Sequence, residues 1–133
     1  MRTVFLDTVG LVALWDEDDQ WHQDAEKAME EIRKSNCRLV TTPYVLLECG
    51  NTAARTSYRK DVHELKKELE THGNLLHPDN KDEEKAWESY LRGEAGNAGI
   101  VDHASFVLMR KHQVKQAFTN DRHFRAAGFE TLF

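Results

Sequence analysis

Four carboxylates stand where one expected structural element gives way to the next. Asp7 and Asp121 close short apolar runs that are typical of buried strands, and Glu48 and Asp102 interrupt apolar segments with helical spacing. An acid in such surroundings is costly to desolvate unless another group compensates its charge. The simplest compensation for several acids together is a divalent cation, and Mg²⁺ or Mn²⁺ prefers oxygen ligands. Such an ion can bind a phosphate oxygen and activate a water, which predicts phosphodiester hydrolysis.

Each acid, taken alone, also has a purely structural explanation. Asp7 or Asp121 could cap the helix that follows its strand, and Asp102 could favour a helix dipole. Glu48 could form an ion pair with Arg55, which lies on the same helical stripe. The combination is more specific than its parts, because clustered carboxylates repel one another and raise their pKa values unless cations intervene.

The order of the elements decides whether these acids can meet. Hydrophobic periodicity, with Asp19 and Thr42 as expected helix caps, predicts a chain in which strands alternate with helices. This pattern indicates an α/β domain with a mainly parallel central sheet, in which ligands bind beyond the carboxyl ends of the strands. The expected strands are 3–6, 37–41, 75–77, 114–119 and 130–133, and the expected helices are 8–15, 20–34, 43–57, 58–72, 82–91, 101–112 and 121–127.

Length and composition bound the class of protein. The 133 residues are expected to form one domain, 1–133, and no apolar run approaches the roughly 18 residues that span a bilayer. The first residues lack a signal-peptide pattern, and two cysteines make no disulfide framework, so a cytoplasmic location without a membrane partner is expected. The net charge of −5 does not suggest a nucleic-acid binder, yet 49–60 holds three basic residues and no acid.

Four segments of the sequence resemble a known family. They are FLDTVGLVALWDEDDQWHQDA, TTPYVLLECGNTAAR, AGIVDHASFVLMRKHQV and AFTNDRHFRAAGF, and together they cover nearly the whole chain. In this order they resemble the PIN-domain ribonucleases, in particular the VapC-type toxins of bacterial toxin–antitoxin pairs. The resemblance implies a three-layer PIN-like fold and Mg²⁺-dependent RNA cleavage, with Mn²⁺ as a substitute. The acidic quartet of the family maps onto Asp7, Glu48, Asp102 and Asp121, and Thr119 matches a small hydroxyl residue that supports the site.

The resemblance also implies partners. They are an RNA substrate, a cognate antitoxin protein that inhibits the toxin, and a second copy of the chain in a homodimer. From the residues themselves, Trp15 and Trp21 could line an apolar groove for the inhibitor, although large aromatic residues at such positions are more often part of the core. The candidate phosphate contacts are the basic residues Arg55, Arg59, Arg110, Lys111 and Arg122.

Three positions depart from the family pattern. Val9 and Val101 stand where hydroxyl residues are common, and His123 stands where some members carry a further acid. None of these changes removes a member of the quartet. They leave open whether the site holds one ion or two, and how hydrogen bonds orient Asp7 and Asp102.

Other classes of function fit the sequence less well. A haloacid-dehalogenase-type phosphatase needs a second Asp at position 9, and a zinc hydrolase motif that begins at His63 fails at Lys67. The acidic run 16–19 lacks the glycine of a calcium loop, and no serine or cysteine nucleophile signature is present. A PIN fold that only binds RNA or protein, without catalysis, stays as the alternative.

Overall fold

A parallel sheet forms the centre of the computed structural model, which describes residues 1–133. Its strands are β1 (Thr3–Leu6), β2 (Arg38–Val40), β3 (Gln116–Phe118) and β4 (Glu130–Thr131), in the order β2-β1-β3-β4. All three pairings are parallel. The inner strand β1 is an apolar run because both of its faces are covered, and its residues Val4, Phe5 and Leu6 are almost fully buried.

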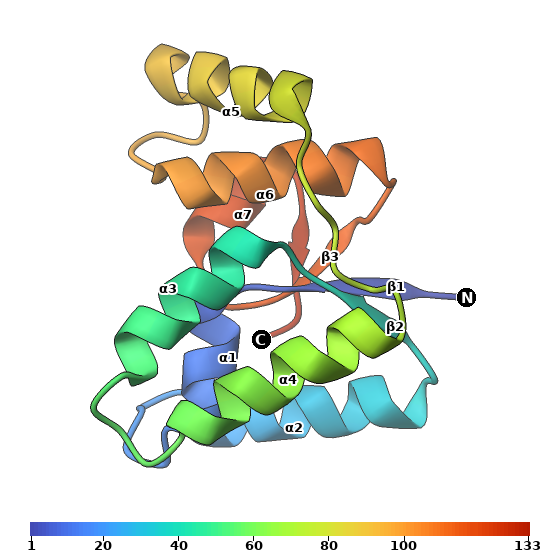
Figure 1. Ribbon diagram of the computed structural model, residues 1–133, viewed down its shortest axis with the longest axis vertical. Coiled ribbons are helices and arrows are strands. Elements are labelled where there is room, and N and C mark those ends of the chain that lie inside the picture. The colour runs from blue at the N-terminus through green and yellow to red at the C-terminus, as the bar shows by residue number, and fades with distance from the viewer.

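Seven helices cover the sheet and complete three layers. Figure 1 shows α5 and α6 on one side of the sheet and α2 and α4 on the other. The main packing contacts agree, because α5 lies against α6, whereas α1 lies against α2 and α3. The α/β fold with a parallel central sheet, expected from the sequence, is therefore confirmed. The helices are α1 (Thr8–Trp15), α2 (His22–Lys34), α3 (Pro43–Ala53), α4 (Arg59–Thr71), α5 (Asn80–Arg92), α6 (Ile100–Lys111) and α7 (Arg122–Ala126).

Local hydrogen bonds explain where several helices begin and end. The side chain of Thr42 accepts a hydrogen bond from the Val45 amide, with Pro43 in the first turn, as expected for the start of α3. At α5, Asp79 and Asp82 form a reciprocal capping box, so the helix begins two residues before the predicted 82. Gly93 then ends α5 in a left-handed conformation that glycine adopts without steric cost.

Some predicted boundaries are wrong. The α3 helix ends at Ala53 instead of 57, because Thr56 donates to the Ala53 carbonyl and turns the chain. The α2 helix begins at His22 instead of 20, because Asp19 accepts from the Trp21 amide in a turn outside the helix. The strand expected at 75–77 is a single bridge between Thr41 and Leu75.

One close approach ties the first helix to the sheet. A Cβ atom built on Gly10 in α1 would lie 2.0 Å from the carbonyl oxygen of Phe118, at the end of β3. Only glycine therefore allows α1 to lie this close to that strand. The contact draws the start of α1, with Asp7 before it, toward Thr119, which follows β3.

Two further sequence expectations concern cysteines and membranes. Cys37 and Cys49 are both free thiols in the structure. None of the helices combines the length and the hydrophobicity needed to cross a bilayer.

Candidate active site

The four predicted acids converge on one cavity at the carboxyl edge of the sheet. Asp7 follows β1, Asp121 precedes α7 just after β3, Asp102 lies in the first turn of α6, and Glu48 lies within α3. All four line a cavity of about 400 Å³ together with Thr8, Val9, Asn51 and Thr52. Parallel strands bring their carboxyl ends to one edge, which is why residues more than 100 positions apart meet here.

Asp7 is the most deeply buried acid of the group. Its exposed fraction is 1%, and its Oδ2 accepts a hydrogen bond of 2.8 Å from the hydroxyl of Thr119. The same hydroxyl oxygen accepts from the Asp121 amide at 3.0 Å, so Thr119 connects the first and last acids. Asp7 occupies the position before α1, but its side chain makes no capping bond. The helix-cap explanation therefore fails for Asp7.

The electrostatics follow from burial and crowding. The pKa of Asp7 is raised to about 8, mainly by burial and then by the nearby carboxylates of Asp102 and Asp121, against the opposing hydrogen bond from Thr119. The pKa of Asp102 is raised to about 6, mainly by burial and then by Asp121 and Glu48, while His123 opposes the rise. Negative charge is thus disfavoured in this cavity unless a cation accompanies it.

Glu48 accepts a hydrogen bond from a threonine hydroxyl and forms no ion pair with Arg55. Its Oε1 accepts a hydrogen bond of 2.7 Å from Thr8, which follows Asp7 directly. No ion pair joins Glu48 to Arg55, and the Arg55 side chain is exposed. The intrahelical pair that the sequence left open does not form, so Glu48 remains an acid of the cavity.

Asp121 has two roles in the structure. Its Oδ1 accepts from the His123 amide at 2.9 Å and so caps α7, as its position after a strand suggested. The same oxygen lies 2.9 Å from Nδ1 of the His123 ring, and that nitrogen lies 4.0 Å from Asp102 Oδ2. On the other side of the ring, Nε2 lies 2.8 Å from the amide oxygen of Asn97.

The sequence did not single out every residue of the site. Thr8 has a detectable signal, since a hydroxyl residue directly after an acid at a strand end can reach a neighbouring carboxylate. Asn97 has none, because it belongs to the glycine-rich loop before α6, 26 residues from its partner His123. Asn51 and Thr52 lie one turn beyond Glu48 on α3.

The donor set suits a hard divalent cation. The cavity is lined by carboxylate oxygens from four different elements, which are the ligands that Mg²⁺ and Mn²⁺ prefer. Asp102, Asp121 and His123 each offer one atom, and these three atoms lie within 4.8 Å of one another. The residues therefore fit the divalent cation that the resemblance implies.

The five predicted phosphate contacts fall into two groups. Arg110 pairs with Glu94 at 2.8 Å, and Lys111 pairs with Asp82 at 2.9 Å, both in the last turn of α6 and away from Asp102 in its first turn. Arg55, Arg59 and Arg122 are exposed and form no ion pair. Arg122 is the nearest to the acids in sequence, since it follows Asp121.

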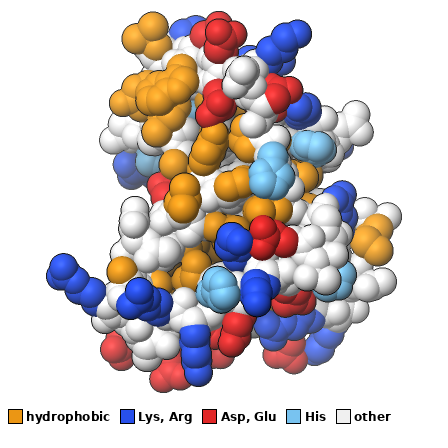
Figure 2. All heavy atoms as spheres, in the orientation of Figure 1, with side chains coloured by type: hydrophobic (Ala, Val, Ile, Leu, Met, Phe, Trp, Pro, Cys, Tyr) orange, Lys and Arg blue, Asp and Glu red, His pale blue; other side chains and the backbone are white.

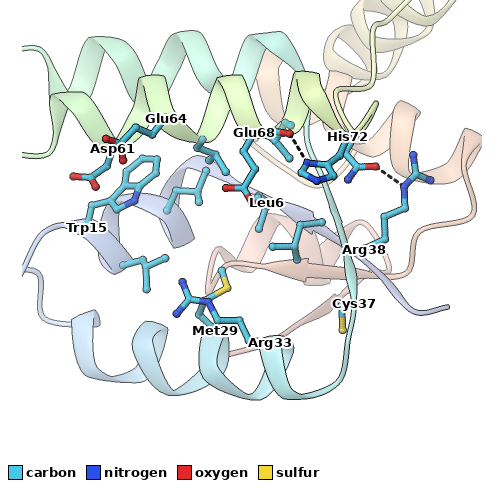
Figure 3. A pocket seen from close by; sticks show the side chains of 16 residues that line it. Leu6, Trp15, Met29, Arg33, Cys37, Arg38, Asp61, Glu64, Glu68 and His72 are labelled. Atoms are coloured by element: carbon cyan, nitrogen blue, oxygen red, sulfur yellow. Dashed lines mark hydrogen bonds between the residues drawn. The ribbon is translucent and has the colours of Figure 1, made fainter.

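A separate groove of about 530 Å³ lies between α1, α2, β2 and α4. Figure 3 shows that Trp15 reaches into it beneath Asp61 and Glu64 of α4, while Arg33 and Met29 border it from α2. Trp15 also stacks on Tyr58, with ring centroids 6.2 Å apart. Trp21 is 43% exposed and does not line the groove, so neither of the two alternatives, a groove residue or a core residue, holds for Trp21.

A parallel α/β sandwich with four acids over one edge defines the class to which this protein belongs. Residues 4–130 match the PIN domain family, so the chain belongs to that family. It is 32% identical over 132 residues to the 23S rRNA-specific endonuclease VapC20 of Mycobacterium tuberculosis, with 95% of each chain covered. The resemblance to VapC-type PIN domains, predicted from the sequence, is confirmed.

Solved structures agree with this assignment. The crystal structure of Mycobacterium tuberculosis VapC20, described as a sarcin–ricin loop cleaving toxin, superposes with a TM-score of 0.77, 26% identity and 95% of each chain covered. FitAcB from Neisseria gonorrhoeae superposes with a TM-score of 0.66 at 15% identity, covering 98% of this chain and 96% of the other. At that identity the second likeness shows the fold alone.

The raised pKa of Asp7 leads to a prediction about stability. A group that binds protons more tightly in the folded state makes unfolding easier as the pH rises between its unfolded and folded pKa values. For Asp7 this pH interval runs from the ordinary pKa of 3.8 to the raised pKa of about 8. Asp102 affects the pH dependence of stability only up to about pH 6. We expect the free energy of unfolding of the metal-free protein to fall from pH 6 to pH 8 more steeply than that of Asp7→Asn.

Urea unfolding of both proteins in EDTA measures this difference. The comparison with Asp7→Asn cancels the contributions of the histidines, which both proteins share. Parallel stability curves across this interval would show that Asp7 is not strained by its surroundings.

Proposed function

We propose that this PIN-domain protein is a metal-dependent endoribonuclease that acts as the toxin of a toxin–antitoxin pair. The observation that carries the proposal is the burial of Asp7 among three further carboxylates that share one cavity. Such an arrangement is costly without a cation and is typical of functional sites. The VapC20 relative, which is named as an endonuclease of 23S rRNA, supports RNA as the substrate class.

The side chains have distinct proposed roles. Asp7, Asp102 and Asp121 would hold Mg²⁺, or Mn²⁺ in its place, and Glu48 would hold the ion or orient a water beside it. When bound, the ion would supply charge neutralisation at a phosphate oxygen and a more acidic water. Thr119 positions Asp7 and Thr8 positions Glu48 through their hydroxyl donors. The second oxygen of Glu48 receives no hydrogen bond from the protein and is free to accept one from water.

RNA is proposed to approach over three exposed arginines. Arg55, Arg59 and Arg122 are free of intramolecular ion pairs, and their positive charges would offset the repulsion between phosphates and the acids. Arg110 and Lys111 are already paired with acids, so we assign them a smaller part. The relevant compartment is the cytoplasm, where cellular RNA is found. A ribosomal stem-loop is the first substrate to test, given the relative described as cleaving the sarcin–ricin loop.

We expect purified protein to cleave 23S rRNA or another structured RNA with Mg²⁺ or Mn²⁺, and EDTA to stop the reaction. Asp102→Asn preserves shape but removes one charge and one ligand, so cleavage should fall by at least about a hundredfold. Thermal melts provide a second readout, because Mg²⁺ should raise the melting temperature of the wild type far more than that of the variant. Cleavage that survives EDTA would refute the metal mechanism. Inactivity on all RNAs would favour the alternative of a non-catalytic binding module.

The arginines can be tested separately from catalysis in the Asp102→Asn background. Arg55→Gln, Arg59→Gln and Arg122→Gln should each weaken RNA binding and reduce the slope of log affinity against log salt by about 0.7, because one phosphate contact fewer releases fewer counterions. Lys34→Gln at the end of α2 is the control and should leave the slope unchanged. If all three arginine variants behave like the control, these arginines are ordinary surface charges.

The groove beside Trp15 is the proposed site for the antitoxin. It has an apolar floor from Leu11, Leu14 and Leu65, a basic edge at Arg33 and Arg38, and an acidic edge at Asp61, Glu64 and Glu68. A helix with an apolar stripe between an acidic and a basic edge would complement it. Expression of the toxin alone should arrest growth, and a small protein encoded beside it should relieve the arrest. Normal growth with active protein would contradict the toxin role.

A homodimer is proposed through the face shared by α3 and α5. Figure 2 shows hydrophobic side chains gathered over one end of α5 and along the hollow between α3 and the α5–α6 pair. Leu47, Trp87 and Leu91 are 67%, 56% and 86% exposed, which is unusual for large apolar residues near one another. A second copy would remove this surface from water.

Trp87→Glu should therefore convert the dimer to a monomer, since a charge at the centre of an apolar interface is not solvated there. Trp21→Glu is the matched control, because Trp21 is also exposed but lies on a different part of the molecule. Light scattering coupled to size-exclusion chromatography measures the mass of each variant. A wild type that elutes as a monomer at high concentration would remove the dimer from the proposal.

A further inference from the structure

His123 occupies an unusual place for a histidine in a site built from acids. Its Nδ1 lies 2.9 Å from Asp121 Oδ1 and 4.0 Å from Asp102 Oδ2. The ring is largely enclosed, with its side chain 21% exposed. It is therefore neither a free surface group nor a core residue, and one of its nitrogens faces two of the proposed metal ligands.

The other nitrogen of the ring decides which atom is the acceptor. Nε2 lies 2.8 Å from the Oδ1 atom of Asn97, and an amide oxygen only accepts hydrogen bonds, so Nε2 donates. In the neutral ring, Nδ1 then carries the lone pair, and it points toward Asp121 and Asp102. Three electron-rich atoms that face one another repel, and either a proton on Nδ1 or a cation among them removes that repulsion.

The two separations from His123 Nδ1 are compatible with the dimensions of one ion. An octahedral ion with bonds of about 2.1 Å keeps neighbouring donor atoms about 3 Å apart and opposite ones about 4.2 Å apart. His123 Nδ1 lies 2.9 Å from Asp121 Oδ1, close to the separation of neighbouring donors. It lies 4.0 Å from Asp102 Oδ2, between the two separations. All three donor atoms lie within 4.8 Å of one another. Asn97 would then act as metal-site histidines require, by fixing the tautomer and the ring orientation.

We propose that His123 is a direct nitrogen ligand of the catalytic ion and that it tunes the site toward Mn²⁺ and away from Mg²⁺. The proposal rests on the function proposed above, since it assumes a cation among the acids. Mg²⁺ strongly prefers oxygen donors, whereas Mn²⁺ and the later first-row ions accept imidazole more readily. A site of carboxylates alone would lack this preference. Asn97 is the positioning residue for the ring.

The direct test is pulsed electron paramagnetic resonance of Mn²⁺ bound to the protein without RNA. A coordinated imidazole gives a ¹⁴N modulation, which we expect in the wild type and not in His123→Ala. Isothermal titration with each ion should show that His123→Ala weakens Mn²⁺ binding at least about tenfold and Mg²⁺ binding less than about threefold. His112→Ala, at the exposed end of α6, is the control and should match the wild type in both measurements.

Two further variants separate ligation from a structural role. His123→Asp replaces nitrogen with oxygen and should narrow the difference between Mn²⁺ and Mg²⁺ affinity, whereas a residue that only supports α7 would affect both ions alike. Asn97→Ala should weaken Mn²⁺ binding while the ¹⁴N modulation persists. If His123→Ala does not fold, the wild-type spectrum and Asn97→Ala still decide the question.

The outcomes distinguish this inference from the proposed function. Mn²⁺ binding that Asp102→Asn weakens, without a ¹⁴N modulation, overturns the nitrogen ligand and leaves the nuclease intact. If His123→Ala weakens the binding of Mn²⁺ and of Mg²⁺ by the same factor, the nitrogen ligand is likewise overturned and the nuclease is left intact. A wild type that binds neither ion overturns both proposals.

Discussion

The burial of one carboxyl group beside three other acids is the constraint around which this molecule is organised. Asp7 is almost fully buried, and its nearest ionisable neighbours in the cavity are other acids. Its pKa of about 8, against the usual 3.8, expresses how strongly these surroundings disfavour the ionised form of the carboxyl group. The fold tolerates the arrangement because one hydroxyl, from Thr119, satisfies Asp7 and orders the amide of Asp121 at the same time.

The rest of the structure positions that hydrogen bond. Phe5 and Leu6 anchor the end of β1 in the core, and Ala117 and Phe118 do the same for β3. The two strands pair in parallel, so Leu6 lies opposite Phe118, and the residues that follow them, Asp7 and Thr119, come side by side. Gly10 allows α1 to lie against the end of β3. An aliphatic residue at position 10 would push α1 away and lengthen the contact between Asp7 and Thr119.

The acidic cavity adjoins an apolar hollow on the surface of the protein. The cavity shares Glu48 and Asn51 with the apolar hollow that runs toward Tyr44 and Trp87. The acids are thus bordered on one side by hydrophobic surface. The exposed residues Arg55 and Arg122 lie just beyond the end of α3 and at the start of α7. The groove beside Trp15 is separate and is lined by different helices. The surface proposed for the second copy therefore adjoins the acids, whereas the groove proposed for the inhibitor is lined by other residues.

The sequence by itself determined the class of fold and the membership of the acid cluster. The apolar runs around Phe5 and Ala117 are continuous because parallel strands are buried on both faces, and helices with one apolar stripe separate them. Those local patterns were sufficient to place Asp7 and Asp121 at strand ends. The limits of α3 and of the strand at 75–77 were not predictable, because a threonine turn and a single bridge depend on contacts outside each segment.

Only the tertiary structure decided what each acid contacts. Glu48 had an available partner in Arg55 on its own helix, yet it meets Thr8 because α1 and α3 pack together. Nothing local to Asn97 or His123 indicates that they meet, since their contact depends on how the loop before α6 lies over α7. Side-chain chemistry follows from sequence, but the distances that turn four acids and a histidine into one site arise from the packing of elements far apart in the chain.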